Sequence, residues 1–321
     1  MSLDREDSRI FTLSVVEPKL FIDSLFPLGI IFQDDRFSLE DFLDFLQVKK
    51  HELFKSGSTV ATNWEQWDIF ETMTHPNQED AVKDFIQNIA QSAEKRQLTN
   101  ETVPPICRSW SSANKNHPAR GGDVNRKPDL VCTDPIGVSD DWRHFRALVE
   151  IKSGELTPRS VYLLLQERAA VIFRHQDRRR FVLTFALIKH EMIIALFDRG
   201  GSVISPPFNI IDRPLLFLKV VLGLSFAPEE YLGYDTTIIT RPSFRIINSR
   251  FLGRVTIHCT LFLADRMDGR GTVVWLAVLE GDALTAALPK LIQSYFHWSS
   301  PSRHMSLPLV VKDAWIDEKN S

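Results

Sequence analysis

Residues 127–155 read KPDLVCTDPIGVSDDWRHFRALVEIKSGE, and this stretch decides the fold. It contains two apolar runs, at 130–132 and 145–151, each long enough for a strand. Aspartate, proline, glycine and serine lie between the runs, which is the composition of a turn. The stretch therefore predicts two strands that pair as a hairpin.

Three ionisable side chains lie at the ends of these two predicted strands. Glu150 and Lys152 are two positions apart, so they point to the same face of a strand. Asp129 comes directly before the first run, and pairing of the two strands brings it near Glu150. Two carboxylates and an ammonium at a sheet end suit a Mg²⁺ ion and a bound water. The alternative is a turn at Asp129 and an ion pair between Glu150 and Lys152 on a solvated face.

The segments on either side of the hairpin predict flanking helices and further strands. Helical spacing of apolar residues predicts one helix at 78–95 and another at 158–174. Two strand-like runs, 181–188 and 192–197, follow the second helix. The order helix, strand, strand, helix, strand, strand predicts an α/β fold, with α+β as the alternative, built on a mixed sheet flanked by helices.

This arrangement resembles the PD-(D/E)xK nuclease-like superfamily. The residues that carry the resemblance are Pro128-Asp129 and, after the hairpin, Glu150-x-Lys152. The resemblance implies that Asp129, Glu150 and Lys152 are catalytic and that Asp129 and Glu150 bind Mg²⁺. It also implies nucleic acid as a partner at this site.

Two residues on the predicted helices extend the same resemblance. Gln166 is on the helix after the second strand, where such families often place a polar catalytic residue. Glu79, in the first turn of the leading helix, is a further candidate metal ligand. The alternatives are a surface glutamine and a glutamate that complements the helix dipole.

Length and charge indicate how the chain is divided. A length of 321 residues, with 44% hydrophobic and 25% charged residues, is ordinary for a soluble globular protein of about two domains. We expect an acidic, helical N-terminal region at 1–75, an α/β domain at 76–240 and a β module at 251–321. Basic residues exceed acidic ones around the hairpin, which suits a phosphate-bearing partner.

The β module at 251–321 contains a glycine-rich turn and a strand lysine. The turn is DGRG at 268–271, with Gly269 and Gly271, and the later apolar run LVVKDAW presents Lys312. A glycine turn over the phosphates and a lysine that grips them hold ATP in the amino-terminal lobe of protein kinases. The alternative is a hairpin in which the glycines serve the turn alone.

Several ordered motifs between residues 76 and 317 together resemble the fungal-type protein kinase family. They are KPDL at 127–130, RRFV at 179–182, LFDR at 196–199, FLKVVLGL at 217–224, GYDTT at 233–237, GRGT at 269–272 and VVKDAW at 310–315. The resemblance implies an accessory region ahead of a serine/threonine-type kinase lobe. It also implies that Gly269, Gly271 and Lys312 bind ATP with Mg²⁺, and that the partner or substrate is a protein.

The 321 residues contain no H-R-D and no D-F-G sequence, whose aspartates phosphoryl transfer requires. The sequence therefore predicts a truncated family member whose ATP-binding lobe is incomplete and which is inactive in phosphoryl transfer on its own. One alternative is a Mg²⁺-dependent nuclease or phosphodiesterase that uses Asp129, Glu150 and Lys152. The other is a catalytically silent protein-interaction module.

Cysteine spacing and hydropathy predict the compartment. The three cysteines form no C-x-x-C pair, and the N-terminus has no basic segment followed by an apolar core. The longest apolar run, 215–227, is too short to span a bilayer. We expect an intracellular protein, cytoplasmic or nuclear, without a membrane partner.

Overall fold

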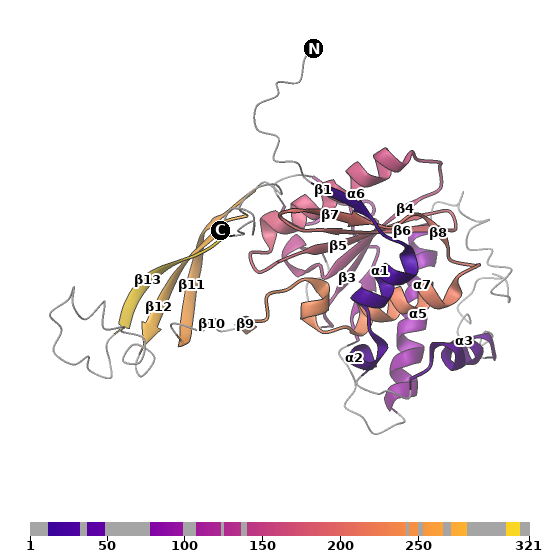
Figure 1. The fold of residues 1–321 in the computed structure, drawn as a ribbon, viewed down its shortest axis with the longest axis horizontal. Coiled ribbons are helices and arrows are strands. Elements are labelled where there is room, and N and C mark those ends of the chain that lie inside the picture. The colour runs from indigo at the N-terminus through magenta and orange to yellow at the C-terminus, as the bar shows by residue number, and fades with distance from the viewer. Residues whose placement is uncertain are drawn as a thin grey trace, which may run out of the picture.

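The computed structural model describes residues 12–32, 37–48, 78–98, 107–122, 125–135, 140–241, 244–249, 253–265, 271–280 and 306–314. Within these residues the chain forms two β-sheets, and helices cover both faces of the first (Figure 1). The predicted α/β class is thus confirmed.

The first sheet is mixed and has eight strands in the described part of the chain. They are β1 (Thr12–Val15), β2 (Ser109–Ser111), β3 (Leu130–Thr133), β4 (Ala147–Lys152), β5 (Val182–Ile188), β6 (Glu191–Phe197), β7 (Gly201–Ile204) and β8 (Phe208–Asn209). Their order is β1-β7-β6-β5-β4-β3-β2, and β8 pairs with β6. The predicted hairpin is the antiparallel pair β3–β4, in which Leu130 lies opposite Val149. β4 and β5 are parallel, because a helix connects them.

Helices pack on both faces of this sheet. They are α1 (Pro18–Leu25), α2 (Leu28–Phe32), α3 (Leu39–Val48), α5 (Gln78–Leu98), α6 (Pro158–His175) and α7 (Pro214–Phe226), with short 3₁₀ helices η3 (Trp142–His144) and η4 (Glu229–Leu232). α6 and η3 cover one face, and the remaining α-helices lie on the other (Figure 1). Thr157 caps α6, since its side chain accepts a hydrogen bond from the Ser160 amide.

Helix α7 is the centre of the larger core. It is apolar around its whole circumference, so it is stable only when buried on all sides. α1, α2, α3 and α5 contact it, and Phe26 packs so closely that a Cβ on Gly223 would lie 2.3 Å from its ring. Lys219, the one charged residue of α7, forms an ion pair with Asp23 of α1. Elements from the predicted 1–75 region thus pack against elements of 76–240, and the boundary at residue 75 stays a prediction.

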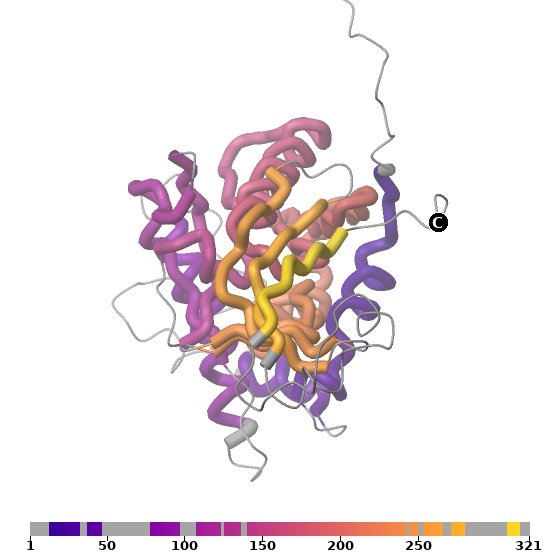
Figure 2. The backbone as a smooth tube through the Cα atoms, turned by 90° about the vertical axis from the view of Figure 1, so that its left-hand side faces the viewer, coloured from indigo at the N-terminus to yellow at the C-terminus, as the bar shows by residue number. Residues whose placement is uncertain are grey.

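The second sheet is antiparallel in order β13-β12-β11-β10-β9 within the described residues. Its strands are β9 (Ile238–Arg241), β10 (Phe244–Ser249), β11 (Gly253–Leu263), β12 (Val273–Glu280) and β13 (Ser306–Asp313). β11, β12 and β13 run side by side at the front of Figure 2. Val255, Trp275 and Ala277 are buried on one face, whereas the opposite face is open to solvent.

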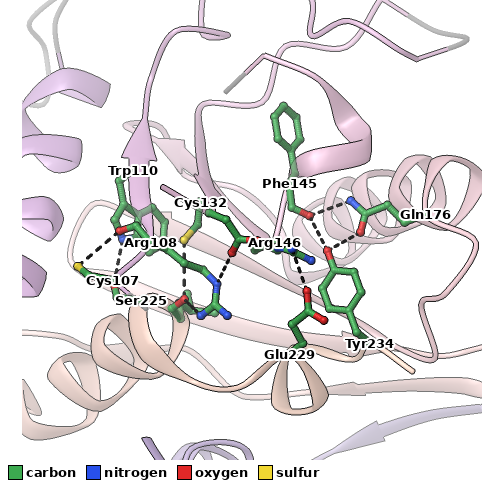
Figure 3. Close-up of polar contacts among 12 residues, drawn as sticks. Cys107, Arg108, Trp110, Cys132, Phe145, Arg146, Gln176, Ser225, Glu229 and Tyr234 are labelled. Carbon is green, nitrogen blue, oxygen red and sulfur yellow. Dashed lines mark hydrogen bonds and ion pairs between the residues drawn. The ribbon is translucent and has the colours of Figure 1, made fainter. Parts of the chain in front are cut away.

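A buried polar network holds the segment that leads into β9 against the first sheet (Figure 3). The Tyr234 hydroxyl donates to Gln176 Oε1 at 2.8 Å, and Gln176 Nε2 donates to the Phe145 carbonyl at 2.8 Å. Arg146 forms an ion pair of 2.9 Å with Glu229. Burial alone would raise the pKa of Glu229, but the hydrogen bond from Arg178 and the neighbouring arginine charges lower it. The network therefore fixes the segment 229–234, which connects the first sheet to β9 of the second.

Three guanidinium groups stack on the Tyr234 ring inside this network. Arg179 lies 3.7 Å from the ring centroid, and Arg146 and Arg178 each lie 4.5 Å from it. Arg179 also donates to the carbonyls of Phe145 and Arg146, at 2.9 Å and 2.7 Å. Burial lowers the pKa of Arg179 to about 10. The RRFV and GYDTT motifs thus meet at this stack, which accounts for their residue types in structural terms.

The cysteines are free thiols; Cys132 is buried and Cys107 is half-buried. Burial raises the pKa of Cys107 and of Cys132 to about 12, whereas Cys259 is exposed on β11. Among the helices that the structure describes, none combines the length and the apolar character that crossing a membrane would need.

Candidate functional site

The predicted residues at the end of the β3–β4 hairpin converge. Lys152 Nζ lies 2.6 Å from Asp129 Oδ2 and 3.1 Å from Glu150 Oε2. The Ile151 amide also donates to Asp129 Oδ2, at 2.7 Å, which fixes that carboxylate at the strand end. Glu150 is completely buried. Its pair with Lys152 therefore does not lie on a solvated face, and the two carboxylates meet around one ammonium.

A fourth residue, Arg168 of α6, completes this cluster. Its Nε donates to Glu150 Oε1 at 2.6 Å, and the residue is 7% exposed. The sequence signal that could have found it is its place in the apolar stripe of α6, in line with Val161, Leu165 and Ile172. An arginine at a buried helix position needs a buried partner. That partner is Glu150.

The cluster balances its own charge. Asp129 and Glu150 supply two negative charges, and Lys152 and Arg168 supply two positive ones. Burial and the charge of Glu150 raise the pKa of Asp129, although Lys152 and the Ile151 amide act against this. Burial opposes the charged form of Lys152, but the two carboxylates outweigh it and raise the pKa of Lys152. The cluster thus pairs each carboxylate with at least one cationic side chain.

The helix residues predicted for this site lie apart from these contacts. Gln166 is half-buried on α6 and makes none of the hydrogen bonds that hold the cluster; Arg168, two positions later, reaches Glu150 instead. Glu79 lies in the first turn of α5. Nowhere in the described ranges do three His, Cys, Asp or Glu side chains gather in a group that could hold a metal ion. Metal binding by Asp129, Glu150 and Glu79 stays a prediction.

The predicted nucleotide residues belong to the second sheet. Gly269 lies outside the described residues, and Gly271, with φ of +49°, comes two positions before β12. Lys312 is an exposed residue of β13 and pairs in register with Val274 of β12. Val274 in turn pairs with Phe262 of β11. Phe262, Val274 and Lys312 therefore form one row across three strands.

This row lies on the open face of the second sheet. Val273 and Trp275 are buried on the opposite face, and neighbouring strand residues alternate between faces. On the open face Phe262 is 53% exposed and Val310, two positions before Lys312, is 68% exposed. The row thus places exposed apolar side chains next to one lysine on a surface open to solvent.

An α/β domain followed by an antiparallel sheet that presents a strand lysine is consistent with a kinase-like α/β protein. The family model described as fungal protein kinase matches residues 128–321, more than half of the chain. The chain belongs to this family. No curated protein and no solved structure matches it. The matched region contains both the cluster around Glu150 and the strand with Lys312.

Proposed function

We propose that the chain binds ATP, with Mg²⁺, on the open face of the second sheet, as the nucleotide-binding part of a protein kinase. The observation that carries this proposal is the position of Lys312, exposed on the strand next to the one that follows the glycine turn. A kinase of this family acts on a protein, so a protein substrate or partner is part of the proposal.

The chemistry of the row supports ATP more than a smaller anion. Phe262 and Val274 offer apolar surface for a purine, and Lys312 stands at the end of the row, where phosphates would meet its ammonium. Phosphoryl transfer needs the aspartates of H-R-D and D-F-G motifs, which these 321 residues do not contain. We therefore propose nucleotide binding, and not transfer, as the activity of these residues on their own.

Lys312→Met is expected to weaken ATP binding by about tenfold or more, because a charge-assisted contact with phosphate is lost. Isothermal titration of the full chain with Mg²⁺–ATP measures this. The matched control is Arg254→Met, which removes an exposed cation from the same face at the other end of β11. Equal ATP affinity of the Lys312→Met protein and the unaltered chain would reject Lys312 as the phosphate contact. No measurable affinity in the unaltered chain would reject ATP binding altogether.

We also propose a second candidate function, Mg²⁺-dependent cleavage of a phosphodiester in nucleic acid. The convergence of Asp129, Glu150 and Lys152 favours it, since this is the donor set that the PD-(D/E)xK resemblance implies. Asp129 and Glu150 would hold the ion, and Lys152 would neutralise the charge that develops on phosphate. Arg168 weighs against it, because it already neutralises Glu150.

For this second function, Lys152→Ala is expected to abolish cleavage of single- and double-stranded DNA and RNA in Mg²⁺ or Mn²⁺ while far-ultraviolet circular dichroism stays unchanged. Lys19→Ala, which removes an exposed lysine of α1, is the control and should cleave as the unaltered chain does. If the unaltered chain cleaves none of these substrates with either ion, the nuclease proposal fails. If the chain binds a protein partner but neither cleaves nucleic acid nor binds ATP, the result would instead favour a protein-interaction module.

A further inference from the structure

One carboxylate of the α/β domain holds three strands of the second sheet. Asp177, two residues after α6, accepts from Arg245 Nη2 of β10 at 2.7 Å. It also accepts from Thr260 Oγ1 of β11 at 2.5 Å and from Trp275 Nε1 of β12 at 2.8 Å. The Asp177 side chain is only 15% exposed. Three hydrogen bonds from three adjacent strands therefore converge on a shielded anion.

These hydrogen bonds keep Asp177 charged. Burial alone would raise its pKa, but the hydrogen bonds from Thr260 and Trp275 and the charge of Arg245 lower the pKa overall. Hydrogen bonds to an ionised acceptor are stronger than those between neutral groups. The contact is thus a firm one at neutral pH.

Two of the strands that Asp177 holds, β11 and β12, are consecutive in the chain on either side of the glycine motif. β11 ends at Leu263 and β12 begins at Val273, and Gly271 comes two positions before β12. Thr260 lies three residues before the end of β11, and Trp275 lies two residues after the start of β12. Asp177 therefore holds the end of β11 and the start of β12, and it lies on the face opposite Lys312.

The α/β domain makes a second contact, between Arg199 and Gly271. A Cβ on Gly271 would lie 2.6 Å from Cγ of Arg199, so the arginine side chain runs directly against this glycine. The guanidinium of Arg199 lies 4.4 Å from the Phe173 ring centroid, which ties it to α6. A cavity of about 220 Å³ is lined by Asp177, Arg199, Leu263 and Gly271, among others. The α/β domain thus contacts β11, β12 and Gly271 through Asp177 and Arg199.

We propose that Asp177 is a positioning residue for the nucleotide site. By holding β10, β11 and β12 it sets the position of Gly271 and of the start of β12 relative to Lys312, although it touches no nucleotide itself. ATP affinity then depends on a contact that the α/β domain makes from behind the sheet. This inference rests on the proposed ATP site of the second sheet.

The test compares Mg²⁺–ATP affinity and hydrogen exchange in the full chain with and without Asp177→Asn. Asparagine keeps one carbonyl oxygen but loses the charge and the second acceptor. We expect the dissociation constant for ATP to rise about fivefold or more, the lower end of coupling between distinct sites. Amides of β11 and β12 should exchange faster. Arg213→Gln, which removes an exposed ion pair with Glu17, is the matched control and should leave both readouts unchanged.

Two milder variants distinguish a positioning effect from a loss of folding. Trp275→Phe and Thr260→Val each remove one donor to Asp177 and keep a similar shape. Each should raise the ATP dissociation constant by less than Asp177→Asn does. Such graded changes would support a positioning role for Asp177. The ATP dissociation constant is measured on folded protein, so a purely structural role of Asp177 would leave that constant unchanged.

The outcomes separate this inference from the function on which it rests. If the unaltered chain binds ATP and Asp177→Asn binds it equally well, with faster exchange in β11 and β12, the positioning role is wrong and the ATP site stands. If the unaltered chain does not bind ATP, both proposals fall. If Asp177→Asn changes neither affinity nor exchange, the contact itself does not hold the strands.

Discussion

Arg168→Met is expected to lower the free energy of unfolding by about 3–5 kcal/mol, because it leaves a buried carboxylate with one cation in place of two. Glu150 is completely buried, and its Oε1 receives the 2.6 Å hydrogen bond from Arg168. Lys152 contacts the other oxygen and is shared with Asp129. Urea unfolding followed by circular dichroism at pH 7 measures the change.

Two further variants show whether the lost charge is the cause. Arg159→Met makes the same substitution at an exposed position of α6 and should change stability by less than about 0.5 kcal/mol. The double variant Glu150→Gln/Arg168→Met removes both charges and should be more stable than Arg168→Met alone, since no unpaired charge stays buried. A loss below about 1 kcal/mol in Arg168→Met would contradict the buried ion pair.

Gly233→Ala is expected to cost about 3 kcal/mol, from backbone strain and steric overlap together. Gly233 ends η4 with φ of +89°, a conformation that residues with a side chain rarely adopt. A Cβ at this position would lie 2.0 Å from the Phe181 carbonyl oxygen. The Gly233 carbonyl also accepts from the Arg180 amide at 2.7 Å, so any shift would disturb the chain at the start of β5. Thermal and urea unfolding both report this change.

Other glycines of the same chain separate the two causes. Gly253 has φ of +70° but no atom within 4 Å of a Cβ, so Gly253→Ala should show the strain alone, about 1–2 kcal/mol. Gly154 has neither positive φ nor a close neighbour, and Gly154→Ala should be neutral or slightly stabilising. Equal effects at Gly233 and Gly253 would show that the contact with Phe181 relaxes without cost.

The sequence predicted those parts of the fold and the site that depend on local patterns. The β3–β4 hairpin, helix α6 and the β5–β6 pair follow from apolar periodicity and turn residues. The convergence of Asp129 with Glu150 and Lys152 follows from strand geometry once the hairpin is known. These inferences need only neighbouring strands and the two-residue repeat of a β-strand.

The remaining features depend on contacts between distant segments. The resemblance indicates Gln166, whereas Arg168 continues the apolar stripe of α6 and reaches Glu150. Asp177 follows a helix end, where a charged residue is ordinarily a solvated one, and nothing local points to Thr260 and Trp275 as its donors. Such partners are about 80 to 100 residues away, beyond the range of periodicity and turn signals.

The parallel pairing of β1 with β7 has a consequence for the newly made chain. Thr12 of β1 pairs with Gly201 of β7, and α1 packs against α7. Each of these N-terminal elements therefore contacts a segment that is synthesised about 190 residues later. At a synthesis rate of 5–20 residues per second, that interval is about 10–40 s. During this interval α7 does not yet cover the apolar side chains of Phe21, Ile22 and Phe26. Chaperones that bind nascent chains at the ribosome can then bind this exposed apolar surface. β1 can therefore join the first sheet only after β7 has been synthesised.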